Sequence, residues 1–461
     1  MTAPERPWSG RRLHIVGVGG AGMSGYARAA HALGAQVSGS DQSASPYTER
    51  LASDGVLRAR IGEHDAANVP GGEDVEVVYS SAVPPENPER AAARARGLPE
   101  RSRAELLGEL TKLRRTIAVA GTHGKTTTSS MLVCALRAAG LHPDWLVGGS
   151  VGAGEANAQW AGEGDWLVVE ADESDRSLLM LDVEIAVLTN VELDHHATFG
   201  SLAELREAFR AFLARARTAI VVWDRPELLA LVPGAVAGED QIAEQAEVVP
   251  YDAPEPALAE GGSRLRWRGH EVTLAVPGAH NALNAIAALE AARLAGVDEK
   301  RAVAGLEGFS GAGRRFQPVG RTARGARVYD DYAHHPTEVA ATLAGARTLA
   351  HERLLAVFQP HLYSRTAMFA RELGAALAEA DLTIVLDVYP ARERGEDHPG
   401  VTGLLVAEAA ADAAQGRPVY WLPTFADAEP VLRELLGEGD LCVVMGAGDV
   451  DELAHRLAGS G

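Results

Sequence analysis

The sequence predicts an α/β protein of three domains built on doubly wound, mostly parallel sheets. Two glycine-rich turns each follow a short apolar run and precede a stretch with helical spacing of apolar residues. Several later apolar runs end in polar residues, as strands do at the binding edge of such a sheet. At 461 residues the chain is too long for one core, and about three domains account for its length.

The composition restricts the classes of partner. The formal net charge of −20 argues against nucleic-acid or membrane-surface binding, so any phosphate site must be local. Residues 1–12 contain no apolar run, and no uncharged stretch reaches about 18 apolar residues, so we expect neither a signal peptide nor a membrane-spanning helix. Cys134 and Cys442 lie in apolar stretches and predict a reduced, buried pair in a cytoplasmic protein.

The first glycine-rich turn is GVGGAG at residues 17–22. A strand is predicted over 12–18, a helix follows the turn, and a second strand over 36–41 ends in Asp41. This is the G-x-G-x-x-G pattern in its strand–turn–helix context. Alone it suggests a dinucleotide with Asp41 at a ribose, but the same turn binds other nucleotide diphosphates.

A third apolar run, at residues 75–80, predicts a strand that leads into the polar, proline-containing segment 80–89. Ligands of doubly wound sheets bind at the carboxyl ends of strands, where this segment would lie. Both interpretations stay open here, a ligand-binding loop and an ordinary rigid loop.

The second glycine-rich turn lies in AVAGTHGKTTT, residues 118–128. A strand over 116–120 precedes it, and a helix that stops near Gly140 follows it. Such a turn binds phosphate through backbone N–H groups, with Lys125 at the β- and γ-phosphates and the Thr126 hydroxyl on Mg²⁺. The first glycine of the usual P-loop spacing is replaced by Val119, and the alternative is a turn that only caps a helix.

Two further strand ends carry acids. A strand over 165–170 ends in Glu170, at the usual place of the second protein contact to Mg²⁺. A strand over 184–190 is followed by Glu192, Asp194 and the pair His195–His196, which together could hold a second cation.

The rest of the chain adds polar groups at predicted helix starts and strand ends. Asn281 and Asn284 share one face of an Ala-rich helix, where they could recognise an adenine edge or cap the helix. Strands predicted over 354–361, 382–387 and 441–446 end in polar or glycine-rich residues. We place the domain boundaries so that the three domains cover residues 1–115, 116–318 and 319–461.

A series of motifs in order along the chain resembles the Mur ligases of bacterial cell-wall synthesis. The motifs are GVGGAGMSG, SSAVPPENPE, GTHGKTTT, EADESD, TNVELDHH, HNALNA, GAGRRF, DDYAHHPTE, FQPHLYSRT and DVYPARE. Within the family, GGAGMSG and DDYAHHPTE resemble the alanine-adding member. One position departs from the pattern, because Ala197 stands where the family often has an aspartate, which puts a metal or water contact there in doubt.

The resemblance implies a Rossmann-like UDP-binding domain, a central P-loop ATPase-like domain, and a Rossmann-like amino-acid-binding domain that closes over both. The implied reaction joins L-alanine to the carboxylate of UDP-N-acetylmuramate through an acyl phosphate, with ATP and Mg²⁺, in cytoplasmic peptidoglycan precursor synthesis. The implied protein is a monomer or homodimer without nucleic-acid or membrane partners.

The resemblance also implies roles for individual residues. The residues expected at ATP are Gly121, Thr122, His123, Gly124, Lys125, Thr126, Thr127, Asn281, Asn284, Arg315 and Asp330. Those expected at the UDP-sugar are Gly19, Gly20, Ala21, Gly22, Asp41 and Ser81. Those expected at alanine and the reacting carboxylate are His334, His361 and Arg365. Thr126 and Glu170 are expected at one Mg²⁺ ion and His195 at a second. The catalytic set is Lys125, Glu170, His195, His334 and Arg365.

Two other functions would account for part of the sequence. A nicotinamide-dependent dehydrogenase would explain the first turn but leaves Lys125 and Glu170 unexplained. A nucleotide-gated regulator built on an inactive ligase would be expected to have lost Lys125 or a metal ligand, and none is missing.

The lysine content adds one expectation. Several sister ligases carry a CO₂-carbamylated lysine that bridges metals in the central domain. The chain has only Lys112, Lys125 and Lys300, so no lysine lies between Thr126 and Glu299 to be modified.

Overall fold

The structure is a computed structural model that describes residues 6–152, 155–194, 198–234, 246–253 and 255–459. The chain divides into two compact units, residues 1–252 with 284–308, and residues 253–283 with 309–461. Among the described residues, no helix is both long enough and apolar enough to cross a membrane.

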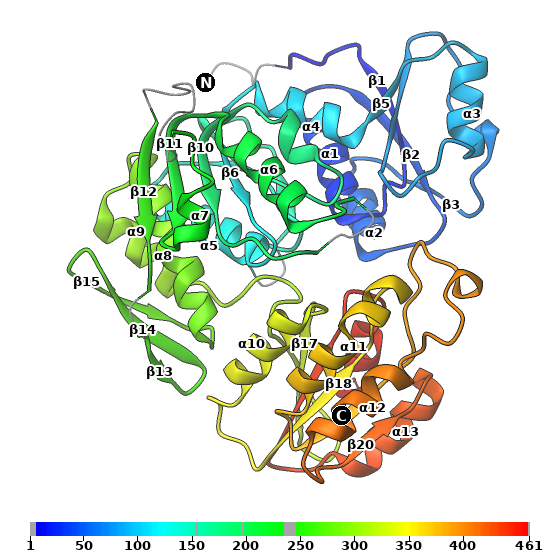
Figure 1. Ribbon diagram of the computed structural model, residues 1–461. Helices are drawn as coiled ribbons and strands as arrows, with labels where there is room; N and C mark the ends of the chain where they lie inside the picture. Colours follow the sequence, from blue (N-terminus) through cyan, green and yellow to red (C-terminus); the bar gives the residue numbers. More distant parts are fainter. Residues whose placement is uncertain (1–5, 153–154, 195–197, 235–245, 254, 460–461) are drawn as a thin grey trace. The chain divides into compact units, whose positions relative to one another are not determined.

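The first unit begins with a five-stranded parallel sheet of order β3-β2-β1-β4-β5. Figure 1 draws this part of the chain in blue to cyan. Its strands are β1 Arg12–Val16, β2 Gln36–Asp41, β3 Arg60–Ile61, β4 Val75–Tyr79 and β5 Glu100–Ser102. Its helices are α1 Ala21–Ala32, α2 Pro46–Ser53, the short η1 Ala66–Asn68, α3 Pro88–Ala95 and α4 Arg103–Thr111. Because the strands are parallel, β1, β2 and β4 end at one edge of the sheet.

The second sheet of this unit has the order β12-β11-β10-β6-β9-β7-β8, and only its edge strand β8 is antiparallel. The strands are β6 Arg115–Ala120, β7 Asp144–Leu146, β8 Ala158–Gln159, β9 Trp166–Glu170, β10 Val183–Leu188, β11 Ala216–Trp223 and β12 Glu247–Tyr251. The helices are α5 Lys125–Ala138, η2 Ser177–Met180, α6 Leu202–Leu213, α7 Pro226–Leu229 and α9 Glu299–Glu307. The long helix α8, Ala279–Leu294, contains the division between the two units.

One apolar core connects the two sheets of the first unit. Buried residues of the first sheet, such as Leu13 and Ile15, belong to the same cluster as Leu167 and Val169 of the second. The helix α1 is the element between them. Gly25 allows this close approach, because a Cβ there would lie 3.0 Å from the Ala158 Cβ.

The second unit contains a small antiparallel sheet and a larger mixed sheet. The small sheet is formed by β13 Ala257–Ala259, β14 Gly262–Trp267 and β15 His270–Leu274. The larger sheet has the order β16-β17-β21-β18-β19-β20, with strands β16 Gln317–Arg321, β17 Arg327–Asp331, β18 Arg353–Phe358, β19 Leu382–Val385, β20 Val419–Trp421 and β21 Asp440–Met445. The helices are α10 Pro336–Ala346, α11 Tyr363–Leu377, η3 Gly395–Asp397, α12 Leu404–Ala413, α13 Phe425–Leu435 and α14 Asp451–Ala458.

Helices cover both faces of this larger sheet, as the continuous apolar character of its strands requires. Along β18, Leu354 and Phe358 pack into a cluster with residues of α10, α11 and α12. The intervening Leu355 and Val357 pack into a second cluster with residues of α13 and α14. The alternation of side chains along a strand therefore assigns each residue to one of two cores.

The predicted α/β class is confirmed, with differences at several element ends. β1 stops at Val16, before the predicted end at residue 18, because Gly17 has a left-handed backbone with φ of +80°. The helix α3 begins inside the segment predicted as loop, since Pro88 starts it and the Asn87 side chain accepts from its first N–H groups. Both cysteines are free, but Cys134 is only partly buried, which corrects the expectation of two buried thiols.

Candidate functional site

The second glycine turn connects β6 to α5 with two glycines in the left-handed region. Gly121 has φ of +134°, and a Cβ there would lie 2.1 Å from Thr189 Oγ1. Gly124 has φ of +82° and precedes α5 without any side-chain cap. The first N–H groups of α5 therefore remain available at the positive end of the helix dipole, which suits them to bind an anion.

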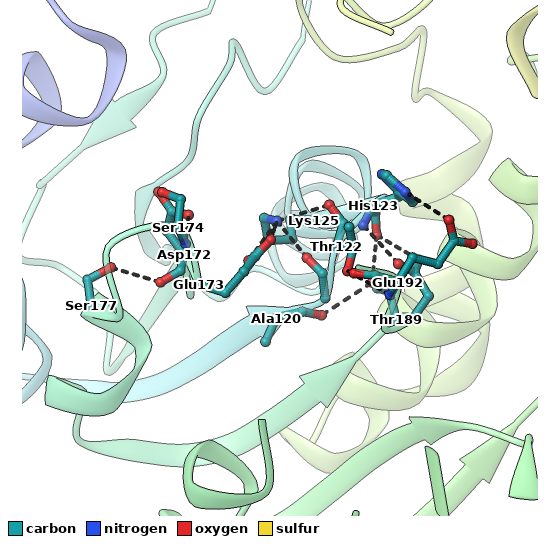
Figure 2. A network of polar contacts seen from close by, with 12 residues as sticks. Ala120, Thr122, His123, Lys125, Asp172, Glu173, Ser174, Ser177, Thr189 and Glu192 are labelled. Carbon is teal, nitrogen blue, oxygen red and sulfur yellow. Dashed lines mark hydrogen bonds and ion pairs between the residues drawn. The ribbon is translucent and has the colours of Figure 1, made fainter. Parts of the chain in front are cut away.

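The segment after β10 holds this turn in place. Thr122 Oγ1 donates to the Glu192 carbonyl and accepts from the Glu192 N–H, both at 2.9 Å. Thr189 Oγ1 donates to the His123 carbonyl at 2.6 Å, and Asn190 Oδ1 accepts from the His123 N–H at 2.8 Å. Figure 2 shows Thr189 and Glu192 beside Thr122 and His123 of the turn. The contacts fix the backbone that would surround a phosphate.

Lys125 begins α5 and points back into the turn (Figure 2). Its Nζ lies 2.5 Å from the Gly121 carbonyl and 3.0 Å from Glu173 Oε2. Burial alone would lower the pKa of Lys125, but the carboxylates of Glu173, Asp172 and Glu170 outweigh it, so the pKa is raised. The lysine is thus a fixed positive charge at neutral pH, in a segment that a phosphate could approach.

The two residues expected to offer oxygen ligands to Mg²⁺, Thr126 and Glu170, both lie in the first unit, as Lys125 does. Glu170 ends β9, and its Oε1 accepts from the Gly148 N–H at 2.6 Å. Thr126, in the first turn of α5, is 6% exposed. A hydroxyl and a carboxylate are hard oxygen donors, so this donor set fits Mg²⁺. His195 and Ala197 lie outside the described residues.

The first glycine turn connects β1 to α1, and its residues 17–22 include no cationic side chain. The Gly17 and Val18 N–H groups donate to the Ser40 carbonyl at 2.9 and 3.1 Å. The Gly19 N–H donates to Asp41 Oδ2 at 2.8 Å, so Asp41 fixes the turn itself. Gly20 precedes α1 without a side-chain cap, which leaves this helix N-terminus available too.

The remaining residues expected at the UDP-sugar lie at the start of α1 or at the same sheet edge. Ala21 is the first residue of α1, and Gly22 follows it. Ser81 is exposed in the loop after β4, which neighbours β1 in the sheet. The structure thus brings the six predicted residues Gly19, Gly20, Ala21, Gly22, Asp41 and Ser81 to one edge.

Beneath this edge lies a polar cluster that the sequence analysis did not predict. Glu89 is fully buried, and its carboxylate contacts His14 Nε2 and His64 Nδ1, each at 2.7 Å. Ser40 Oγ and Asn68 Nδ2 donate to the same group. Burial alone would raise the pKa of Glu89, but these partners outweigh it and lower the pKa to about 2. The carboxylate is therefore an ionised structural centre of the first domain.

The two asparagines of α8 have different surroundings. A Cβ at Gly124 would lie 2.5 Å from Asn284 Oδ1, so Asn284 borders the phosphate turn. Asn281 Nδ2 donates to the Pro277 carbonyl at 2.7 Å, a local contact at the start of the helix. Asn284 therefore lies beside the phosphate turn, and Asn281 contacts the backbone at the start of its own helix, while the role of both at a nucleotide stays a prediction.

In the second unit, three predicted residues lie close together. The His361 ring lies 5.9 Å from the His334 ring, and its Nδ1 is 3.2 Å from an Arg365 guanidinium nitrogen. Tyr389 stacks on His361 with ring centroids 5.8 Å apart. Tyr389 was not among the predicted residues, although it lies in one of the quoted motifs. The cluster combines a cation, two imidazoles and a phenol.

Asp330 and Arg315 have partners of their own in this unit. Asp330 Oδ2 accepts from Arg314 Nε at 3.2 Å, and burial raises the pKa of Asp330 to about 6. Arg315 lies 5.0 Å from the centroid of the Tyr332 ring. The neighbouring Asp331 carboxylate accepts from the Phe316 N–H at 2.7 Å, and burial raises the pKa of Asp331 to about 6 as well. Asp330 is thus buried against an arginine rather than open to solvent.

Several residues near these sites were missed because their partners are distant in sequence. Glu173 contacts Lys125 across 48 positions, and Arg103 contacts Asp172 and Asp175 across 69 and 72 positions. Glu173 lies inside the quoted EADESD motif, so the motif was the available signal for it. No pattern signalled Arg103.

Three family descriptions match successive parts of the chain. Mur ligase family, catalytic domain, matches residues 12–115. Mur ligase middle domain matches residues 119–292, and Mur ligase, glutamate ligase domain, matches residues 314–448. The chain therefore has three domains, N-terminal, middle and C-terminal, while the boundaries proposed above stay predictions.

Curated relatives and solved structures agree with these matches. A UDP-N-acetylmuramate–L-alanine ligase of Nocardia farcinica is 43% identical over 97% of this chain and 94% of its own length. One of Symbiobacterium thermophilum is 45% identical over the same shares. The crystal structure of a UDP-N-acetylmuramate–alanine ligase of Thermotoga maritima has a TM-score of 0.80 at 26% identity and covers 97% of this chain and 98% of its own. This chain belongs to the Mur ligase family.

Proposed function

We propose that the chain is an ATP-dependent ligase that joins L-alanine to the carboxylate of UDP-N-acetylmuramate in peptidoglycan precursor synthesis. The observation that carries the proposal is the partly buried Lys125 at an uncapped helix N-terminus, in a chain whose curated relatives at 43% identity are alanine ligases over nearly their whole length. A carboxylate is a poor acyl donor at neutral pH. It must first take the γ-phosphoryl group of ATP, and the resulting acyl phosphate is then attacked by the neutral amine of alanine.

In this proposal the second glycine turn binds ATP. Lys125 and the N–H groups of α5 stabilise the negative charge that spreads over the transferring phosphoryl group. The turn residues Gly121, Thr122, His123, Gly124, Thr126 and Thr127 surround the phosphates. Asn281, Asn284 and Arg315 are proposed at the nucleotide and Asp330 at its ribose.

Thr126 and Glu170 are the proposed ligands of one Mg²⁺ ion, and His195 is the proposed ligand of a second. When bound, Mg²⁺ supplies charge neutralisation between the phosphate oxygens of ATP. Glu170 and Thr126 offer oxygen ligands, and Glu170 is already oriented by the Gly148 N–H. Mg²⁺ tolerates few protein ligands because it keeps several waters.

The first glycine turn is proposed to bind the UDP part of the sugar nucleotide. Gly19, Gly22 and the N-terminus of α1 face the diphosphate, and Asp41 supports the turn through the Gly19 N–H. His334, His361 and Arg365 are proposed at alanine and the reacting carboxylate, where the Arg365 cation would pair with a carboxylate. We further propose that the protein acts in the cytoplasm as a monomer or homodimer on these small molecules.

One assay tests the function against the two alternatives. We expect phosphate release only when ATP, L-alanine and UDP-N-acetylmuramate are present together. Appearance of reduced nicotinamide cofactor without ATP would instead support the dehydrogenase. Binding of all three ligands without phosphate release would support the inactive regulator.

A further inference from the structure

Arg103 is the first residue of α4 in the N-terminal domain, yet its charge is neutralised by the middle domain. The guanidinium Nη2 lies 2.6 Å from Asp172 Oδ2, and Nε donates to Asp175 Oδ2 in a short contact. Only 16% of the Arg103 side chain is exposed. Burial alone would lower the pKa of Arg103, but the two carboxylates outweigh it and raise the pKa. All three residues belong to the first compact unit.

The same guanidinium borders the first glycine turn. A Cβ at Gly22 would lie 3.5 Å from Arg103 Nη1 and 3.8 Å from the Tyr26 hydroxyl. Tyr26 is buried on α1, one turn beyond Gly22. Arg103 therefore lies between the start of α1, where the diphosphate is proposed to bind, and the acidic segment after β9.

A second contact fixes the start of α1 against the middle domain. Asn157 Nδ2 donates to the Ala21 carbonyl at 2.5 Å and lies 3.3 Å from Ser24 Oγ. Asn157 bonds to the first turn of α1, and Arg103 borders the same turn. A shift of this turn would therefore change the contacts of both residues.

The acidic segment in turn positions the phosphate-turn lysine. Asp172 Oδ1 accepts from the Ser174 N–H at 2.9 Å, and Asp175 Oδ1 accepts from the Ser177 N–H at 3.1 Å. Glu173 lies between the two acids that Arg103 binds and contacts Lys125 (Figure 2). Displacement of Asp172 and Asp175 would move Glu173, and with it the partner of Lys125.

We propose that Arg103 is a positioning residue that links the two glycine turns, so that binding of the sugar nucleotide and of ATP is energetically coupled through the acidic segment. The inference rests on the proposed function, which places the diphosphate and ATP at these turns. An arginine suits this role because its planar group can bind two carboxylates at once, which a lysine cannot do in the same way. If one partner were removed, charge would be left buried and uncompensated, and the segment would have to rearrange.

The test measures coupling rather than activity alone. The dissociation constant of β,γ-methylene ATP is measured by calorimetry with and without saturating UDP-N-acetylmuramate, in the unaltered chain and in Arg103→Met. We expect the sugar nucleotide to tighten ATP-analogue binding by about 5-fold or more in the unaltered chain, within the usual range of coupling. In Arg103→Met we expect this factor to fall below about 2-fold.

Arg101→Met is the matched control. Arg101 lies two residues away, is 40% exposed, and pairs with Glu76 and Glu109 inside the N-terminal domain. The control should keep the full coupling factor. If Arg103→Met does not fold, Arg103→Lys and Asp175→Asn replace it, and both should reduce the coupling because each breaks the two-carboxylate contact.

The outcomes separate the inference from the proposed function. Full coupling in every folded Arg103 and Asp175 variant, or equal loss in Arg101→Met, overturns the inference while the proposed function stands. Independent binding of the two ligands in the unaltered chain overturns it as well. Failure of UDP-N-acetylmuramate to bind the unaltered chain overturns the proposed function and the inference with it.

Discussion

The two glycine turns of the first unit share one backbone design and differ in charge. Each follows a central parallel strand, contains a glycine in the left-handed region, and leads into a helix whose N-terminus has no side-chain cap. Several other helices of the unit have a side-chain cap, as α4 has from Ser102 and α6 from Ser201, although the short α7 has none. The two uncapped helix starts leave N–H groups available at the turns that are proposed to bind phosphate groups.

The difference lies in what faces the turn. The second turn has Lys125, held by Glu173, whereas the first has Asp41, whose carboxylate accepts from the Gly19 N–H. The arginine that borders the first turn, Arg103, comes from α4 and is paired with Asp172 and Asp175. A diphosphate that is only bound can be held by N–H groups and a helix dipole. A phosphoryl group in transfer needs a fixed cation where charge develops. One backbone design can therefore serve binding or chemistry, depending on whether the turn itself contributes a lysine, and four variants or conditions test this difference.

The largest effect is expected at the lysine. Lys125→Ala should fold normally and lose at least about 10²-fold in kcat, because a preorganised charge is removed from the transition state. Lys112→Ala, an exposed lysine in the same unit, is the control and should keep its turnover. Near-normal kcat in Lys125→Ala, measured by phosphate release, would remove the distinction between the two turns.

The next effect is expected at the acid of β9. Glu170→Ala should also lose at least about 10²-fold in kcat, because a metal ligand is removed. Glu170→Gln separates this role from the hydrogen bond with Gly148, since the amide oxygen can still accept from that N–H but carries no charge. Turnover restored by glutamine at ordinary Mg²⁺ concentrations would show that the role of Glu170 is structural.

Substitution in the first turn should change binding and leave the chemical step unchanged. Asp41→Asn weakens the support of the Gly19 N–H, and a charge-assisted hydrogen bond contributes about 1.5–3 kcal/mol. We expect the KM for UDP-N-acetylmuramate to rise by about tenfold, with kcat within about twofold of the unaltered value. Steady-state kinetics with the sugar nucleotide varied would check this, and a fall in kcat with unchanged KM would contradict it.

For the last prediction we expect no change, because the activity should not depend on bicarbonate. Because no lysine lies between Thr126 and Glu299, the second turn has no neighbour that could be carbamylated in the middle domain. Arginine cannot replace it, since its guanidinium stays protonated. Activity should therefore be the same in CO₂-depleted buffer, acidified beforehand, and after bicarbonate is added back. A large loss that bicarbonate restores, or a labile CO₂ adduct in the intact mass, would refute the prediction.

Much of the fold could be predicted because the central strands are short, continuous apolar runs. β6, β9 and β18 are recognisable by this feature alone, since both faces of their sheets are covered. The antiparallel strands β13 and β16 could not be recognised, because they are short and largely exposed and carry little apolar pattern.

The site was predictable where its residues follow one another in sequence. The two glycine turns and Lys125 form local patterns whose geometry follows from their spacing. Arg103 and the buried Glu89 have no such pattern, since each is defined by partners far along the chain. Charged side chains are mostly exposed in folded proteins, so the sequence alone predicts exposure for both residues. Only the tertiary structure identifies a charged side chain that is buried.

The apolar core that the N-terminal and middle domains share has a consequence for how the chain can be divided. Residues of both sheets belong to one cluster, and Gly25 of α1 approaches Ala158 of the middle domain closely. A fragment that ended at Arg115 would expose this face of α1 to water, although its own sheet would be complete. The two domains should therefore melt as one cooperative calorimetric transition, and the N-terminal fragment alone should self-associate through the uncovered surface.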